Sequence, residues 1–199
     1  MYYITMKKKA IIILNLIIIL LELNSLSFDY GLTSLFYYTE LSNLLALITS
    51  IILVITSFKK KLPNYVKVLR YISTVNLTIT FLVVLFVLAP KGNLYNMFIL
   101  DNMFEHHLLC PLLSLFSFMF LEDYKLKLNN IKYPVIITTI YGFILILLNI
   151  FKVIDGPYPF LRVYNQTLLV SITYFIVMTL GCLLISYLII LPKKKWELK

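Results

Sequence analysis

Charged residues are scarce in this chain, and their scarcity excludes a soluble globular domain. Only 14% of the 199 residues are charged, whereas 61% are hydrophobic and the mean hydropathy is +0.92. Soluble domains contain about a quarter charged residues on average. A chain of this composition cannot cover a folded surface with polar side chains, so we expect an integral membrane protein.

Cysteine and glycine are also rare. The two cysteines, Cys110 and Cys182, both fall inside apolar segments and lack the spacing of metal ligands, so we expect neither a disulfide framework nor a cysteine metal site. With only five glycines, the chain has no glycine-rich loop of the kind that binds phosphates. We therefore expect no metal and no cofactor.

Six long apolar segments fill almost the whole chain, and short polar loops separate them. A helix needs about 20 predominantly apolar residues to cross roughly 30 Å of hydrocarbon, and inside lipid its backbone groups must pair with one another. We therefore predict an all-α fold, a single domain over residues 1–199 with six transmembrane helices in one antiparallel bundle. The predicted spans are Ala10–Leu26, Leu35–Phe58, Val68–Ala89, Met103–Leu121, Pro134–Phe151 and Leu168–Leu191.

Basic residues lie almost entirely on one side of this predicted bundle. The net charge is +9, and 15 of the 18 Lys and Arg residues fall on one side of the bundle when the spans are numbered in order. The exceptions are Lys91, Lys152 and Arg162. Because basic loops are retained in the cytoplasm, we predict a multi-pass protein of the cell membrane with both termini cytoplasmic. We interpret the charge as a topology signal with affinity for membrane lipids, not as a nucleic-acid site.

A stripe of small and polar residues runs along the second span. Thr39, Asn43, Ala46, Ser50 and Ser57 share one helical face, while the other faces carry Leu, Ile and Val. Small side chains let helix backbones approach closely, so this stripe marks the side that packs against other helices. The threonine at the head of the stripe should therefore face the bundle interior, just inside the outer end of its span.

The only two histidines, His106 and His107, lie at a similar depth in the fourth span. Pro111 follows them and has no N–H, so we expect the carbonyl four residues earlier, that of His107, to lose its helical partner. Periodicity does not decide which histidine faces the bundle interior. A hydroxyl and an imidazole at one level are the parts of a nucleophile and its base, because threonine needs a base to take its proton.

Three motifs in the chain resemble those of a known six-span membrane family. The motifs are Phe36–Asn43 (FYYTELSN), His107–Pro111 (HLLCP) and Pro157–Leu161 (PYPFL). In order, spacing and span number they resemble the bacterial branch of the group that contains the androgen-induced membrane hydrolases of fatty-acid esters of hydroxy fatty acids. The resemblance covers nearly the whole chain.

This resemblance implies a catalytic pair of one threonine and one histidine. By motif, Thr39 is the implied nucleophile and His107 the implied base, which leaves His106 as a neighbour without an assigned role. The chain departs from the family at Arg162, where many relatives carry an acidic residue.

We therefore expect a membrane-embedded lipid acyl-ester hydrolase, or a related acyltransferase, acting on a lipid ester near the outer leaflet. Two alternatives stay open. One is a non-catalytic membrane scaffold in which every polar residue serves packing, and the other is a small proton-coupled transporter. Glu40 should point about 100° away from Thr39 on its helix. The expected site-supporting residues are Asn43, as the oxyanion donor, with Glu40, Glu105 and His106.

Overall fold

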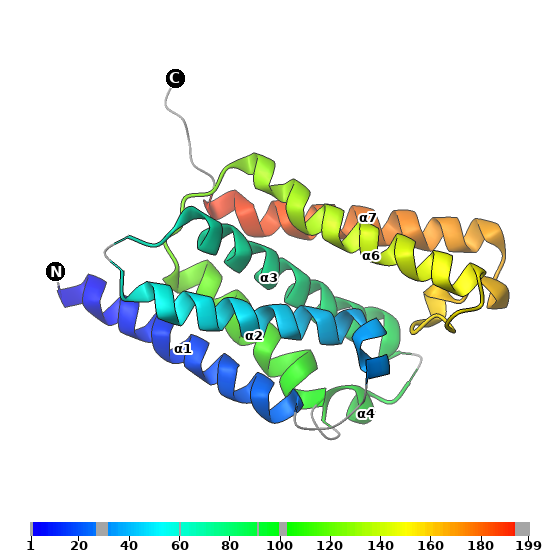
Figure 1. Ribbon diagram of the computed structural model, residues 1–199, viewed down its shortest axis with the longest axis horizontal. Coiled ribbons are helices and arrows are strands. Elements are labelled where there is room, and N and C mark those ends of the chain that lie inside the picture. Colours follow the sequence, from blue (N-terminus) through cyan, green and yellow to red (C-terminus); the bar gives the residue numbers. More distant parts are fainter. Residues whose placement is uncertain (1, 27–31, 60, 91, 100–102, 194–199) are drawn as a thin grey trace.

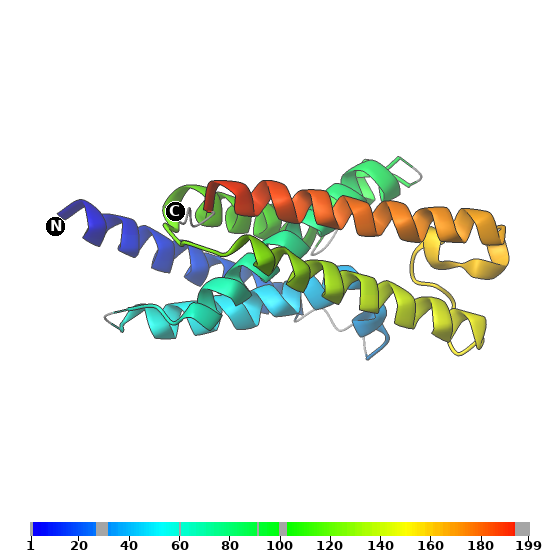
Figure 2. The ribbon, with the colours of Figure 1, turned by 90° about the horizontal axis from the view of Figure 1, so that it is seen from above.

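A computed structural model describes residues 2–26, 32–59, 61–90, 92–99 and 103–193. Every regular element in these residues is a helix, and the long helices run back and forth beside one another (Figures 1 and 2). The predicted all-α class is therefore confirmed. Four helical stretches are long and apolar enough to cross a membrane, and a shorter apolar stretch covers Glu105–Leu121. The four are Tyr38–Ser57, Asn64–Leu88, Leu128–Ile150 and Leu168–Lys193.

The chain order of the helices is as follows. The α-helices are α1 (Tyr2–Leu26), α2 (Tyr38–Ser57), α3 (Asn64–Val83), α4 (Leu94–Phe98), α5 (Cys110–Phe116), α6 (Lys132–Ile150) and α7 (Leu168–Ile190). Wider π-helical turns continue α3 over Val84–Leu88 and flank α5 over Glu105–Leu109 and Ser117–Leu121. Short 3-10 turns cover Leu32–Phe36, Leu128–Ile131, Pro159–Leu161, Val163–Asn165 and Leu191–Lys193.

Three helices begin three or more residues away from the positions that hydropathy predicts. α1 begins at Tyr2 and not at Ala10, because its first turns carry polar and basic residues. α2 begins at Tyr38 and not near Leu35, because a 3-10 turn precedes it. α3 begins at Asn64 and not at Val68, directly after Pro63, whose fixed φ suits the position before a helix. Hydropathy locates only the apolar part of a helix, so the polar first turn of α3 escapes it.

Helix α3 lies at the centre of the bundle. It contacts α2 and α5 on one side and α6 and α7 on the other, while α1 packs against α2 and α5. The α6–α7 pair extends past the ends of the other helices (Figures 1 and 2). α7 exposes large apolar side chains along most of its length, which suits a helix surrounded by lipid.

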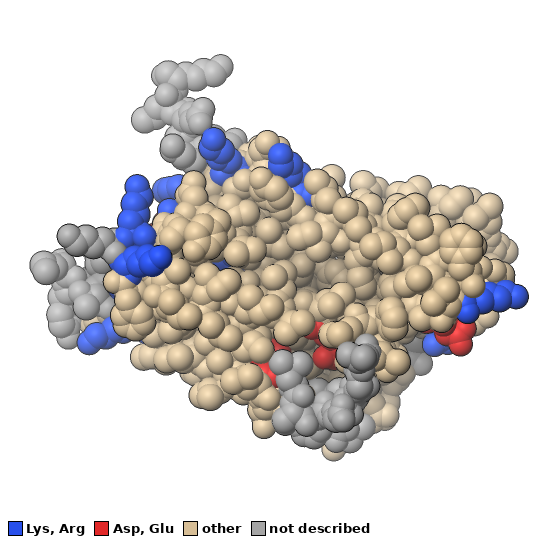
Figure 3. Space-filling model, in the orientation of Figure 1, with Lys and Arg blue, Asp and Glu red and all other residues tan. Residues whose placement is uncertain are grey.

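Charged side chains gather at the ends of the bundle. On the face drawn in Figure 3, most Lys and Arg side chains lie at the end where α1 begins and α7 ends. Two residues assigned to this basic rim from the sequence are instead buried, Arg70 completely and Lys193 almost completely. Arg70 forms an ion pair with Glu122, so it belongs to the interior and not to the rim.

Candidate active site

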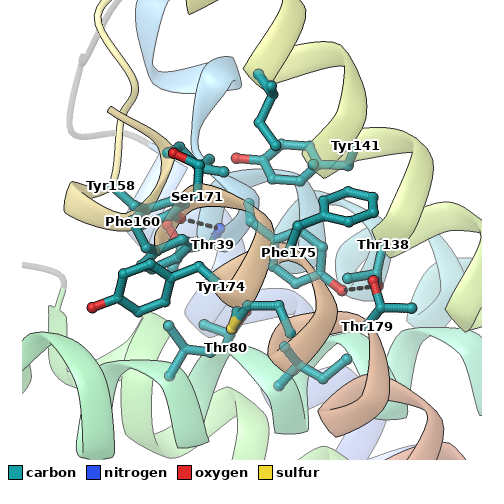
Figure 4. A pocket seen from close by; sticks show the side chains of 17 residues that line it. Thr39, Thr80, Thr138, Tyr141, Tyr158, Phe160, Ser171, Tyr174, Phe175 and Thr179 are labelled. Carbon is teal, nitrogen blue, oxygen red and sulfur yellow. Dashed lines mark hydrogen bonds between the residues drawn. The ribbon is translucent and has the colours of Figure 1, made fainter. Parts of the chain in front are cut away.

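Two cavities meet near the start of α2. The outer cavity, of about 640 Å³, lies between the start of α2, the Glu105–Leu109 turn and the loop that joins α6 to α7. The apolar cavity, of about 60 Å³, lies among α2, α3, α6 and α7 (Figure 4). Thr39 and Tyr158 line both cavities. The outer cavity is lined by Thr33, Ser34, Tyr37, Thr39, Glu40, Leu88, Gly92, Asn96, Met97, Met103, His107, Pro157, Tyr158 and Pro159.

The three sequence motifs therefore converge on one cavity. Thr39 comes from the first motif, His107 from the second and Tyr158 from the third, and all three line the outer cavity. The matching depth of Thr39 and His107 along their spans is the sequence signal that predicts their approach. Sequence reasoning gave Tyr158 no role, because a loop residue carries no helical periodicity.

The backbone of Thr39 is held on both sides. Its N–H lies in the first turn of α2, where helical partners are missing, and it donates to the Tyr158 hydroxyl at 3.2 Å (Figure 4). Its carbonyl accepts from the Ser42 hydroxyl and from the Asn43 amide, each at 2.9 Å. These bonds fix the residue at the junction of the two cavities.

The ring of His107 is oriented by α4. Its Nδ1 lies 2.7 Å from the carbonyl oxygen of Met97. A carbonyl only accepts, so Nδ1 carries a proton, and in the neutral ring Nε2 is then left unprotonated as an acceptor. Phe98 packs edge-on against the ring with centroids 6.5 Å apart. The sequence offers no signal for this orienting partner, because Met97 acts through its backbone.

The adjacent histidine has different surroundings. His106 is fully buried and lines neither cavity. Its Nε2 lies 3.3 Å from a carboxylate oxygen of Glu22 on α1, and its Nδ1 lies 3.4 Å from one of Glu40 on α2. The structure thus brings Thr39 and His107, but not His106, into the wall of the outer cavity.

In the π-helical register of the Glu105–Leu109 turn, the missing Pro111 N–H falls opposite the carbonyl of His106 and not, as expected, opposite that of His107. Cys110 donates its N–H to the Glu105 carbonyl five residues earlier, which is the π-helical register. In this register the next bond would join positions 111 and 106, and proline cannot donate it. The Asn43 amide donates to the His106 carbonyl instead, at 3.4 Å.

Asn43 is a supporting residue, and the expected role as oxyanion donor does not fit its contacts. Its amide nitrogen donates to the carbonyls of Thr39 and His106, so both of its N–H groups are engaged. The side chain is fully buried and lines neither cavity. A polar side chain inside a membrane helix readily bonds the carbonyl one turn earlier, and that local bond is the one formed here.

The two acidic candidates differ in position. Glu40 does not point away from the site, because it lines the outer cavity beside Thr39 and also faces His106. Thr39 and Glu40 are adjacent on the helix and about 100° apart, but the outer cavity is wide enough for both side chains to line it. Glu105 lines neither cavity, and its Oε2 is buried without a hydrogen bond among the described residues.

Comparison with known proteins adds no relative to this geometry. The chain matches no family model, no curated protein and no solved structure. In the described part of the chain, no group of three or more His, Cys, Asp or Glu side chains is placed to hold a metal ion. The wall of the outer cavity carries a hydroxyl, an imidazole, a phenol and the Glu40 carboxylate.

Proposed function

We propose that this chain is a six-span protein of the cell membrane with both termini in the cytoplasm. The four membrane-length helices support this topology, together with α1 and the apolar stretch Glu105–Leu121. The end of the bundle that carries most Lys and Arg is then cytoplasmic. The outer cavity lies near the opposite end and faces the outer leaflet.

The proposed activity is hydrolysis of a lipid acyl ester, or transfer of its acyl group. The observation that carries this proposal is that Thr39 and His107 line one cavity while the Met97 carbonyl leaves Nε2 of His107 unprotonated. The Thr39 hydroxyl oxygen bonds to the ester carbonyl carbon as Nε2 accepts the hydroxyl proton. When the intermediate collapses, the C–O bond to the alcohol breaks and His107 returns the proton to the leaving oxygen. Water, activated in the same way, then releases the acid.

The two cavities suit the two parts of such an ester. The apolar cavity is walled by residues such as Ile79, Phe175 and Met178 and accommodates acyl carbons. The outer cavity has hydroxyl, amide and carboxylate groups in its wall and takes the alcohol part and water. Thr39 stands where they join, which is where the scissile carbonyl must lie. The family resemblance assigns the same nucleophile and base.

The direct test is ester hydrolysis by the purified protein in detergent, across a panel of acyl esters of varied chain length. Thr39→Ala should abolish turnover, and Thr39→Ser should retain part of it because the hydroxyl survives. Thr49→Ala is the matched control, since Thr49 is also a buried threonine of α2 but lines neither cavity. If the wild-type protein is folded and hydrolyses no ester, the non-catalytic scaffold becomes the better description.

Proton-coupled transport is a second candidate, favoured by the row of Glu22, His106 and Glu40. Ionisable groups inside a membrane domain are expensive and commonly mark proton pathways. This reading predicts proton uptake by proteoliposomes that His106→Gln abolishes and Thr39→Ala leaves intact. Uptake that no variant alters would remove this candidate.

A further inference from the structure

Tyr158 is the remaining polar group at the junction of the two cavities. It lies in the α6–α7 loop just before the Pro159–Leu161 turn and is 5% exposed. Its ring stacks on Phe160 with centroids 5.2 Å apart and meets Tyr37 edge-on at 5.7 Å. Among the residues that the structure describes, only Thr39 and Tyr158 line both cavities. The packing of the ring thus places a phenol hydroxyl beside the proposed nucleophile.

The hydrogen bonds of this phenol leave it a donor. The Tyr158 oxygen accepts the Thr39 N–H at 3.2 Å. Burial raises the pKa of Tyr158 to about 12, so the phenol keeps its proton at physiological pH. A phenol carries one O–H donor. Once its oxygen is occupied by a backbone N–H, that proton is what it can offer to a substrate.

We propose, on the basis of the hydrolase function above, that Tyr158 is a catalytic residue that stabilises the oxyanion. As the Thr39 oxygen bonds to the ester carbon, the C=O electron pair moves onto the carbonyl oxygen, and the Tyr158 O–H donates a hydrogen bond to it. The proton stays on the phenol throughout. His107 alone carries the transferred proton, from the threonine hydroxyl to the leaving oxygen.

The position of Tyr158 fills the role that Asn43 cannot fill. Both N–H groups of Asn43 are engaged by carbonyls, and the N–H of Thr39 is engaged by Tyr158 itself. A donor beside the nucleophile must also border the space that holds the carbonyl. Tyr158 meets both conditions, because it touches Thr39 and lines each cavity.

The test compares Tyr158→Phe with Tyr164→Phe. Loss of one oxyanion donor lowers kcat by about a hundredfold or more, so Tyr158→Phe should do so with little change in KM. Tyr164 lies in the same loop, donates to the Ile150 carbonyl and lines neither cavity, so Tyr164→Phe should keep the wild-type kcat. A Tyr158→Phe variant that keeps the wild-type kcat, or changes KM alone, overturns the assignment.

A second variant covers the case in which Tyr158→Phe fails to fold. Incorporation of a difluorotyrosine at position 158 retains the ring and hydroxyl but makes the phenol more acidic. The activity of this variant should fall at high pH as the phenol loses its proton. The pH–activity profile of the wild-type enzyme should lack this decrease. An unchanged pH profile would contradict the donor role. An inactive wild-type protein would instead remove the hydrolase function itself, so the two failures are distinguishable.

Discussion

Two buried ionic clusters occupy this bundle, and they are bonded very differently. In the inner cluster, Arg70 donates to Glu122 at 2.9 Å, to the Ser114 hydroxyl at 2.7 Å and to the Ser114 carbonyl at 3.0 Å. Ser117 donates to the same Glu122 oxygen at 2.8 Å, and Lys193 donates to the Glu122 carbonyl. Each guanidinium nitrogen of Arg70 therefore has a partner, in a cluster that joins α3, α5 and the end of α7.

The outer cluster is loosely connected. His106 lies between Glu22 and Glu40 at 3.3 and 3.4 Å, yet neither ring nitrogen makes a hydrogen bond within the described part of the chain. Both contacts are longer than the 2.9 Å between Arg70 and Glu122. Glu40 also lines the outer cavity. In the inner cluster every guanidinium nitrogen of Arg70 is bonded, although Oε2 of Glu122 lacks a hydrogen bond among the described residues. In the outer cluster both ring nitrogens of His106 and both carboxylate oxygens of Glu22 lack one. Dense bonding is typical of a structural connection, whereas buried polar groups without full bonding are typical of functional regions.

The largest effect should follow from breaking the inner cluster. Arg70→Met leaves the Glu122 carboxylate buried without its charged partner, which costs about 3–5 kcal/mol of unfolding free energy. Detergent-denaturant titration of the purified protein measures this loss. The exposed Lys61→Met is the control and should change little. The double variant Arg70→Met/Glu122→Met should recover most of the stability, and a double variant as unstable as the single one would contradict this description.

Alanine variants of the two histidines should separate the loss of activity from the loss of stability. His107→Ala removes the general base and should lower kcat by about 10²–10⁴-fold. It should also cost about 1–3 kcal/mol of unfolding free energy, because the Met97 carbonyl loses its donor. His106→Ala should retain most of the activity, but it replaces a fully buried side chain by a cavity, which costs about 2–5 kcal/mol of unfolding free energy. Hydrolysis rates and unfolding titrations on the same preparations measure both effects. If His106→Ala is inactive and His107→Ala is active, the base has been assigned to the wrong residue.

The variants with the smallest expected effect test the proposed membrane orientation, in which the outer cluster lies toward the outer face of the membrane. Lys61 and Asn93 both lie at exposed positions. Asn93→Cys removes the hydrogen bond that its side chain accepts from the Tyr95 N–H at the start of α4, which costs about 1 kcal/mol. A membrane-impermeant thiol reagent on intact cells should label position 93 and leave position 61 unreacted, because Lys61 belongs to a basic loop. The opposite labelling would place the outer cavity at the cytoplasmic face.

The features that sequence predicts are those with a periodic signal. The small and polar stripe of α2 is buried as predicted at Thr39, Asn43, Ala46 and Ser50, because burial repeats with the helical turn. Hydropathy likewise locates the long helices. The burial of Arg70 has no such signal, since a basic residue near a predicted loop is normally exposed.

The contacts that complete the candidate site depend on tertiary packing. The π-helical turn at Glu105–Leu109 changes which carbonyl Pro111 leaves free, and propensity does not reveal a shift of one residue in register. The Met97 carbonyl orients His107 through backbone, and Tyr158 reaches Thr39 from a loop 119 residues later in the chain. None of these contacts follows from local periodicity.

The proposed covalent role of Thr39 has one direct measurement. An active-site-directed fluorophosphonate is incubated with the purified protein, and the modified peptide is identified by mass spectrometry. One adduct should form on the Thr39 hydroxyl, with no adduct on Thr39→Ala and unchanged labelling of Thr49→Ala. Labelling of another residue in the folded wild-type protein, or no labelling at all, would contradict a threonine nucleophile.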